Sequence, residues 1–226
     1  MDQYEISYYI RDAENSTNCL LVGDLNFKFD RVTCVKWAAR PQQKRIAIDE
    51  FERDVLPSIV SVVVNCTWEY LNPSFINAFK DCPRFELIYV EEGGQDALDF
   101  IARQVELGNV KTIIFRNPLM TPQQQENLSE TLRTFVNSDR FCSLTAWDGV
   151  YIDFELFELF LERALAGELP TSGYIWAGNV TFDTSRLRAL HPECREERSE
   201  QLSWRNPNSN LRIVLNGLLL FCTWKT

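Results

Sequence analysis

The residues of this chain that could carry out catalysis form no recognisable catalytic motif. The single histidine, His191, lies in a charged stretch near the C-terminus. A single histidine excludes a metal site with several histidine ligands, and a histidine-based catalytic triad could use only His191. A hydrolase that pairs two carboxylates could use four that follow predicted strands or begin predicted helices: Glu91, Glu92, Asp148 and Asp153. Carboxylates at such places usually cap helices or face solvent, so we expect no catalytic residue, no metal and no cofactor.

The seven cysteines also lack the spacing of a metal or redox site. Their number is odd and no C-x-x-C pair is present among Cys19, Cys34, Cys66, Cys82, Cys142, Cys194 and Cys222. This pattern predicts reduced, mostly buried thiols. The first ten residues are acidic and alternate in polarity, unlike a signal peptide. Together these features favour an intracellular protein of the cytoplasm or nucleus.

Composition and charge exclude several broad classes of function. With 45% hydrophobic and 24% charged residues the chain has the composition of a folded protein. The formal net charge is −9, with 23 Lys and Arg against 32 Asp and Glu, which disfavours binding to a phosphate backbone. The longest apolar runs are too short to span a bilayer. We therefore expect no nucleic acid and no membrane among the partners.

The elements that would position any site come from an internal repeat. The pattern Φ-x-x-Φ-x-Φ, where Φ is apolar, begins five times at intervals of 27, 26, 25 and 31 residues, at Val32, Ile59, Phe85, Val110 and Phe141. It predicts at least five parallel strands, centred near Val35, Val62, Ile88, Ile113 and Leu144, each followed by a helix on one side of the sheet. A degenerate sixth copy begins near Pro170 and places Gly173 and Ile175 in the fourth and sixth positions.

The segments between the strands carry the end signals of helices. Thr121 precedes a proline and Gln124 follows three residues later, which predicts a capping box. Gly108 and Gly167 are placed to end two helices. The helix predicted over residues 153 to 166 is apolar around most of its circumference, so we expect it to pack on several sides.

This order of elements predicts an α/β fold. Strand and helix alternating at this spacing are typical of a leucine-rich-repeat-like βα solenoid, with the parallel sheet lining a curved face. The alternative is a doubly wound α/β sheet, which would carry helices on both faces. We predict a single domain over residues 1–226, with an N-terminal β cap at 1–30, repeats at 31–190 and a C-terminal β-hairpin cap at 200–226. The turn of that hairpin is predicted at Asn216-Gly217, and residues 191–201 as a solvated loop or frayed helix.

Five segments of the chain carry a family resemblance. They are Leu25-Asn26-Phe27-Lys28-Phe29, residues 48–57 ending in Leu-Pro, residues 157–169 ending in Gly-Glu-Leu, Val180-Thr181-Phe182-Asp183 and Trp204-Arg205-Asn206-Pro207. In the residue types and spacing of these segments, the chain resembles the F-box-associated, leucine-rich-repeat-like region of nematode F-box proteins. The resemblance covers nearly the whole chain.

The resemblance implies a role in target recognition. Members that carry an F-box are similar to substrate receptors of cullin-based ubiquitin ligases, in which the F-box docks on the adaptor and the repeat region holds the target. No F-box pattern precedes the first predicted hairpin, so we expect the target-binding half without the ligase-docking half. The expected function is a non-enzymatic protein-binding module. The alternatives are a structural subunit of an obligate intracellular complex, and a hydrolase using carboxylates at strand ends.

Strand geometry predicts which side chains would face a partner protein. In each repeat the fourth and sixth residues point into the core, so the fifth and seventh point to the opposite, concave face. These positions supply the predicted binding residues Val63, Tyr89, Glu91, Ile114, Arg116, Trp147 and Trp176, with Tyr89, Arg116 and Trp147 as anchors. In the alternative arrangement a loop or terminal hairpin covers Val63 and Ile114, and the two tryptophans pack on helix N-termini.

Overall fold

The structure is a computed structural model of the 226-residue chain. It describes residues 10–11, 19–20, 53, 62–66, 80–83, 85–90, 94–116, 120–147, 149–170, 172–182, 185–186, 195–198, 201–206, 209–216 and 219–225, several of the strand residues by their backbone alone. The chain divides into two compact units, Met1–Val110 and Lys111–Thr226, and each is described by itself.

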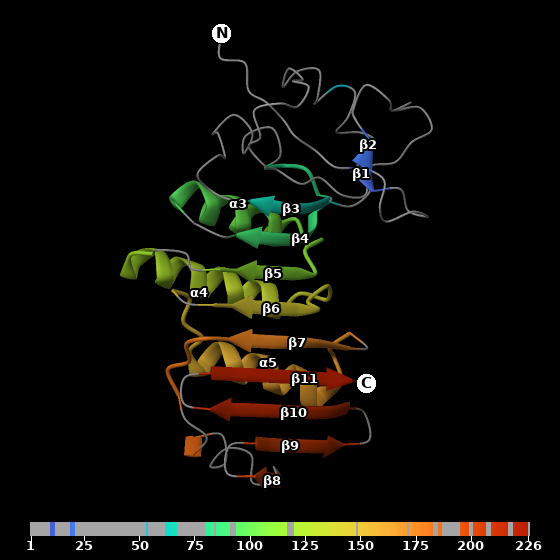
Figure 1. Ribbon diagram of the computed structural model, residues 1–226, viewed down its shortest axis with the longest axis vertical. Helices are drawn as coiled ribbons and strands as arrows, with labels where there is room; N and C mark the ends of the chain where they lie inside the picture. The colour runs from blue at the N-terminus through green and yellow to red at the C-terminus, as the bar shows by residue number, and fades with distance from the viewer. Residues whose placement is uncertain are drawn as a thin grey trace. The chain divides into compact units, whose positions relative to one another are not determined.

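Among its described residues, the first unit contains two strand pairs and one α-helix (Figure 1). Strands β1 (Ile10–Arg11) and β2 (Cys19–Leu20) pair antiparallel within the predicted N-terminal cap. Strands β3 (Val62–Cys66) and β4 (Phe85–Val90) pair parallel, and helix α3 (Gln95–Glu106) follows β4. The helix packs on its strand through an edge-to-face contact of Phe100 with Phe85, whose ring centroids lie 5.3 Å apart. This unit therefore contains one predicted parallel strand pair and one predicted helix, while the strand predicted near Val35 lies outside the described residues.

The register of β3 against β4 corrects one frame of the repeat. The sequence pattern places Val62 level with Ile88, but the strand pairing places Val64 there, two residues further along. The residues from Val62 to Val64 are all valines, so an apolar pattern fits more than one frame. A shift of two leaves the same alternate residues on each face, and for that reason hydrophobic periodicity does not distinguish the two registers.

The second unit joins three parallel strands to an antiparallel set. Its strands lie in the order β5-β6-β7-β11-β10-β9-β8. The strand bounds are β5 Thr112–Phe115, β6 Ser143–Ala146, β7 Ser172–Ala177, β8 Arg195–Arg198, β9 Gln201–Asn206, β10 Ser209–Asn216 and β11 Leu219–Lys225. The pairs β5–β6 and β6–β7 are parallel, and β11 continues the sheet antiparallel to β7.

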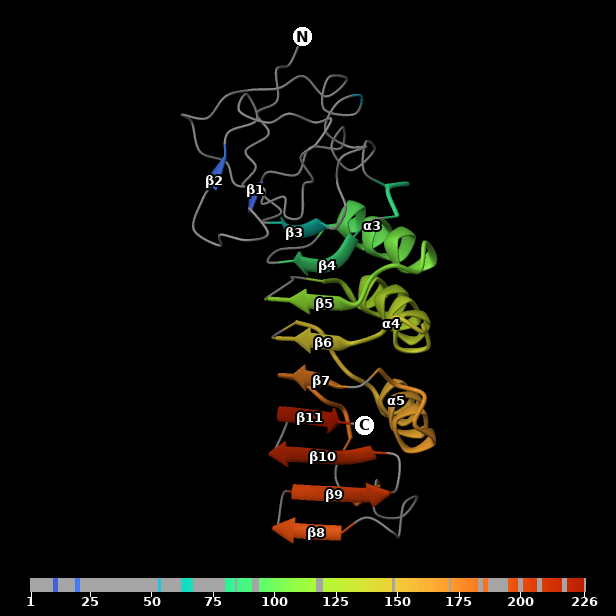
Figure 2. The same ribbon diagram turned by 90° about the vertical axis from the view of Figure 1, so that its right-hand side faces the viewer.

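Helices α4 (Pro122–Val136) and α5 (Phe154–Ala166) of the second unit cover the same face of its sheet. Helix α4 follows β5 and helix α5 follows β6. Figure 2, which views the sheet edge-on, shows the two helices on the same side of the strands. The α/β class is confirmed, and in this unit the other face of the sheet carries no helix among the described residues.

The core of the second unit forms where the repeat predicts it. Ile113, Leu144 and Ile175 are level with one another on β5, β6 and β7, and all three are buried. Ile175 therefore occupies the fourth position of the sixth copy, where the sequence pattern had placed it sixth. Trp176 consequently lies in position five, level with Thr145, instead of position seven.

The predicted helix ends are present. Thr121 and Gln124 form a reciprocal capping box, with the Thr121 amide donating to Gln124 Oε1 at 2.9 Å and the Gln124 amide donating to Thr121 Oγ1 at 3.3 Å. Gly167 ends α5 with a φ of 76°, in the left-handed region that favours glycine. These local signals lie within a few residues of the structure that they specify, so the sequence alone identifies them.

The C-terminal strands differ from the predicted cap. Residues 191–201 were expected to form a loop or frayed helix, but 195–198 form β8, which pairs with β9, and β9 pairs with β10. The cap is thus an antiparallel meander, larger than one hairpin. Strand β8 has the sequence Arg-Glu-Glu-Arg, and without apolar residues it gives no alternation signal. Asn216 pairs with Leu219, while the predicted turn residue Gly217 lies outside the described residues.

Candidate protein-binding face

The face of the second unit's sheet that is opposite α4 and α5 carries a continuous set of aromatic and aliphatic side chains. We call the described side chains on this side of β5, β6, β7, β11 and β10 the open face. Strand register aligns two rows across it: Ile114, Thr145, Trp176, Phe221 and Val214 in one, and Thr112, Ser143, Tyr174, Thr223 and Arg212 in the next. The rows bring together residues separated by more than a hundred positions in the sequence.

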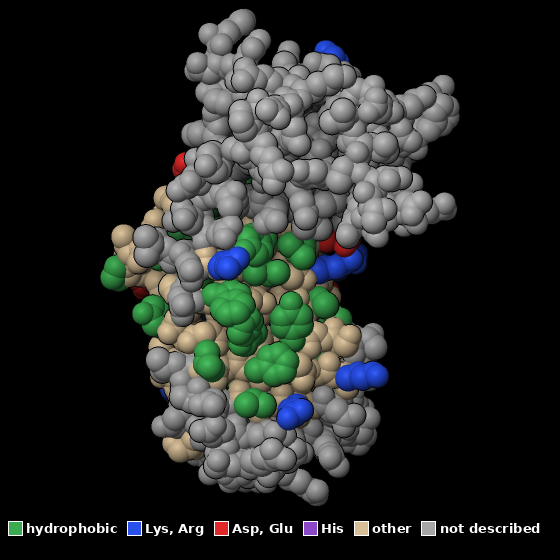
Figure 3. Space-filling model, viewed as in Figure 1, with side chains coloured by type: hydrophobic (Ala, Val, Ile, Leu, Met, Phe, Trp, Pro, Cys, Tyr) green, Lys and Arg blue, Asp and Glu red, His purple; other side chains and the backbone are tan. Residues whose placement is uncertain are grey.

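Much of the large apolar surface of the open face is accessible to solvent. The exposed fraction is 51% for Leu219, 45% for Phe221, 38% for Trp147 and 37% for Tyr174. Trp176 is half-buried and makes an edge-to-face contact with Trp147 at an interplanar angle of 76°. Figure 3, which shows this face, has hydrophobic side chains gathered over β5, β6, β7 and β11. An exposed aromatic cluster of this kind is typical of a protein interaction surface.

The opposite side of β7 and β11 explains why these strands lie together. Trp224 of β11 is buried, stacks on Phe141 with ring centroids 5.7 Å apart, and donates from Nε1 to the Pro170 carbonyl at 3.0 Å. Gly173 of β7 pairs with Trp224, and a Cβ at Gly173 would overlap the Trp224 ring and the Cys142 carbonyl. The absence of a side chain at Gly173 lets the large indole fit. This packing fixes β11 beside β7 and thereby brings Phe221 level with Trp176.

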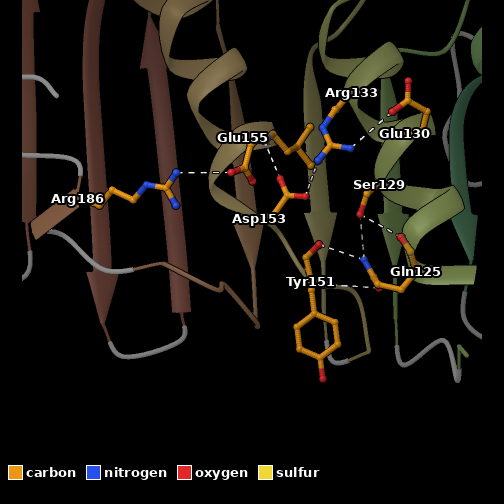
Figure 4. Close-up of polar contacts among 9 residues, drawn as sticks. Gln125, Ser129, Glu130, Arg133, Tyr151, Asp153, Glu155 and Arg186 are labelled. Atoms are coloured by element: carbon orange, nitrogen blue, oxygen red, sulfur yellow. Dashed lines mark hydrogen bonds and ion pairs between the residues drawn. The ribbon is translucent and has the colours of Figure 1, made fainter. Parts of the chain in front are cut away.

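The connection between β6 and α5 holds Trp147 at one end of the face. The Trp147 amide donates to the Phe115 carbonyl at 3.1 Å, which extends the β5–β6 pairing by one residue. Further along the connection, Gln125 of α4 binds both backbone groups of Tyr151, accepting from its amide at 3.3 Å and donating to its carbonyl at 3.2 Å (Figure 4). The segment that follows Trp147 is therefore anchored on a helix.

Asp153, one of the four candidate catalytic carboxylates, has a structural role at the end of the same connection. Its Oδ1 accepts from the Leu156 amide at 2.7 Å and so caps α5. Its Oδ2 accepts from Arg133 Nη2 of α4 at 2.7 Å, and Arg133 also pairs with Glu130 at 3.6 Å (Figure 4). Both carboxylate oxygens of Asp153 are thus engaged in joining the two helices.

The other chemical candidates are distributed as follows. Glu91, Glu92, Asp148 and His191 lie outside the described residues. Within the described ranges, no group of three or more His, Cys, Asp and Glu side chains is placed to hold a metal ion. Cys82, Cys142 and Cys222 take part in no disulfide among the described residues, and burial raises the pKa of Cys222 well above its ordinary value. Among the helices that the structure describes, none is long and apolar enough to cross a membrane.

The predicted binding residues fall into two groups. Ile114, Trp147 and Trp176 come together on the open face, and the exposed Arg116 follows β5 beside them. Val63 and Tyr89 belong to β3 and β4 of the first unit, where Tyr89 is half-buried. The alternative, in which Trp147 and Trp176 pack on helix N-termini, stays a prediction.

Sequence reasoning missed the part of the face that the C-terminal strands supply. Tyr174, Leu219, Phe221, Arg212 and Lys225 were not among the predicted contacts. Strand β11 alternates between exposed and buried residues, so its own sequence indicates that Phe221 and Cys222 face opposite ways. The identity of its neighbour, β7, has no comparable local signal.

Comparison with known proteins identified no relative of this chain. No protein-family model, no curated protein sequence and no solved structure matches the chain. The functional argument therefore depends on the geometry of the molecule itself and on the resemblance noted in its sequence.

Proposed function

We propose that this protein is a non-enzymatic binding module that holds a partner protein against the open face of its second unit. The observation that carries the proposal is the contiguous apolar surface formed by Trp147, Trp176, Tyr174, Phe221 and Leu219. Tryptophan, tyrosine and arginine are the residues most enriched at interaction hot spots, and Arg116 lies beside Trp147 at the end of the β5–β6 pair. Burying these side chains in an interface would remove a large apolar area from water.

The proposed architecture is a leucine-rich-repeat-like βα solenoid capped by β structure. Parallel pairing in β3–β4 and in β5–β6–β7, with a helix after β4, β5 and β6, supports it. By its resemblance to the F-box-associated region of nematode F-box proteins, the module would act as the target-recognition part of an intracellular ubiquitin-ligase receptor. In the first unit, Val63 on β3, Tyr89 on β4 and Glu91 remain proposed further contacts.

The proposal is tested by affinity purification of the full chain from native extract, followed by mass spectrometry and calorimetry with the partner that is recovered. Single Ala substitutions at Trp147, Trp176 and Phe221 should each weaken binding by more than about 1 kcal/mol without loss of fold. Leu159→Ala is the matched control, because Leu159 is a half-buried apolar residue on α5, on the helical side of the sheet. Its affinity should equal that of the unmodified chain.

The outcomes separate the competing functions. Unchanged affinity in all three face variants would place the interface elsewhere and overturn the proposal. A partner that stays bound at fixed stoichiometry through every wash, with an insoluble chain in its absence, would favour the obligate-subunit alternative. Recovery of a cullin adaptor together with the partner would support the ligase-receptor part.

A further inference from the structure

The helical side and the open face of the second unit differ in their described acidic residues. The helices carry exposed carboxylates at Glu126, Glu130, Glu155 and Glu162. The described open-face positions of β5, β6, β7, β10 and β11 contain no Asp or Glu, although the chain has 32 acidic residues. Their charged residues are all cations: Arg116 after β5, Arg212 on β10 and Lys225 at the end of β11, each exposed. Figure 3 shows Lys and Arg side chains around the hydrophobic cluster.

The positions of these cations relative to the aromatic cluster follow from strand register. Arg212 is level with Thr223 and Tyr174, one row from Phe221 and Trp176. Lys225 lies on the same side of β11 as Phe221, because the strand alternates and the two differ by four residues. The aromatic residues thus lie between cations on three strands.

We propose that the partner segment bound by the open face is an acidic polypeptide that carries aromatic or large aliphatic side chains. Its apolar side chains would pack on Trp147, Trp176 and Phe221, and its carboxylates would pair with the surrounding cations. Complementary charge of this kind speeds encounter and selects partners more than it adds raw affinity. The inference rests on the proposed function, since it names the class of protein that the face would accept.

The net charge of −9 for the whole chain is compatible with an acidic partner. Charges more than about 8 Å apart are largely screened at physiological ionic strength, so a short segment on the open face interacts mainly with the cations nearest to it. A nucleic acid has its charge along a continuous backbone and depends on many cationic contacts. The few cations of this face in an acidic protein therefore favour a polypeptide.

The test is selection from a display library of random peptides of about eight residues, long enough in extended form to cross the five strands of the face. The full chain serves as bait. The enriched sequences should be net negative and contain aromatic or large aliphatic residues. The affinity of the best of them, measured by fluorescence polarisation, should fall as salt is raised.

Charge-reversal variants identify the residues responsible. Arg212→Glu and Lys225→Glu should each weaken the selected peptide about tenfold. Arg140→Glu is the matched control, because Arg140 is an exposed cation of the α4–β6 connection, outside the strands that form the face, and its variant should bind as the unmodified chain does. If a charge reversal prevents folding, Arg212→Gln and Lys225→Gln replace it. They should weaken peptide binding relative to the control in the same order, by smaller factors.

Each contrary outcome has a distinct meaning. Enriched peptides without acidic bias, but still sensitive to Trp176→Ala, would overturn the acidic partner and leave the protein-binding function intact. Enrichment that is insensitive to Trp147→Ala and Phe221→Ala would overturn both. A labelled single-stranded oligothymidylate that binds the chain and is released by Lys225→Glu would show that the face accepts nucleic acid, and would also overturn the proposal.

Discussion

Replacing Arg163 by Met should destabilise the second unit by about 2–4 kcal/mol. Arg163 lies on α5 and is only 7% exposed. Its guanidinium donates to the carbonyl of Val136, the last residue of α4, to the Ser138 carbonyl at 2.9 Å and to the Glu168 carbonyl at 3.3 Å. The side chain therefore supplies donors to backbone acceptors at the C-terminal ends of both helices, where carbonyls have no partner within the helix.

The magnitude follows from what each acceptor retains in the variant. The Val136 carbonyl contact is buried, and an unsatisfied buried acceptor costs about 1–3 kcal/mol. The Ser138 carbonyl keeps a bond from the Phe141 amide at 3.2 Å, so its loss is smaller. The ion pair of Arg163 with Glu168 at 3.6 Å adds less than about 1 kcal/mol, because Glu168 is exposed. Methionine preserves most of the apolar packing, so the change reports the lost donors.

The assay is urea denaturation followed by far-ultraviolet circular dichroism, with Arg140→Met as the matched control. Arg140 is exposed, so the identical substitution there should change the free energy of unfolding by less than about 0.5 kcal/mol. Arg163→Lys should fall between the two, since lysine keeps the charge but not the planar fork of donors. A loss below about 1 kcal/mol for Arg163→Met, at an unchanged denaturant slope, would refute the assignment of these hydrogen bonds as stabilising.

Three further changes test the packing beneath the open face. Gly173→Ala should lower the free energy of unfolding by about 2 kcal/mol or more in thermal and urea unfolding, because its Cβ would overlap the Trp224 ring. Gly108→Ala is the control: its φ of +76° strains an alanine, but nothing lies close to its Cβ, so it should cost only about 1 kcal/mol. Equal losses in the two variants would contradict the steric argument. Phe160→Ala should cost about 3–5 kcal/mol because the side chain is fully buried, and a neutral result would contradict the core assignment. Cys222 is protonated in both states near neutral pH, but the unfolded thiol ionises above about pH 8.5 while burial raises the pKa of the folded one. Stability should therefore fall above that pH by up to about 1.4 kcal/mol per pH unit, and an identical alkaline loss in Cys222→Ala would show that another group is responsible.

The strands and helices of the repeat could be predicted because the sequence patterns that specify them are short-range. Alternation predicted that Ile113 and Phe115 are buried while Ile114 faces the other way, and all three lie as expected. The mostly apolar circumference of the helix after Asp153 and the glycine at its end were equally clear in the sequence. Each of these features depends on residues close together in the sequence, whose types directly influence the local backbone conformation.

The register of the strands was harder to predict, as the second and sixth repeats show. Val64 lies level with Ile88 where the pattern had placed Val62, and Ile175 lies level with Leu144 where the pattern had placed Gly173. Both errors are shifts of two residues. Such a shift preserves which residues face the core, so the burial pattern is equally satisfied, and only the packing of particular side chains selects one register.

From the sequence alone one obtains the α/β class, the ends of α4 and α5, the burial of the helix faces and the aromatic character of Trp147 and Trp176. Only the tertiary structure shows that β11, the last strand in the sequence, pairs with β7 and adds Phe221 and Lys225 to the open face. The choice of neighbour depends on whether Trp224 finds a space opposite Gly173, which is a property of residues about fifty positions apart. Local propensities act over a few residues, whereas strand neighbours are selected by how completely the assembled sheet buries its large side chains.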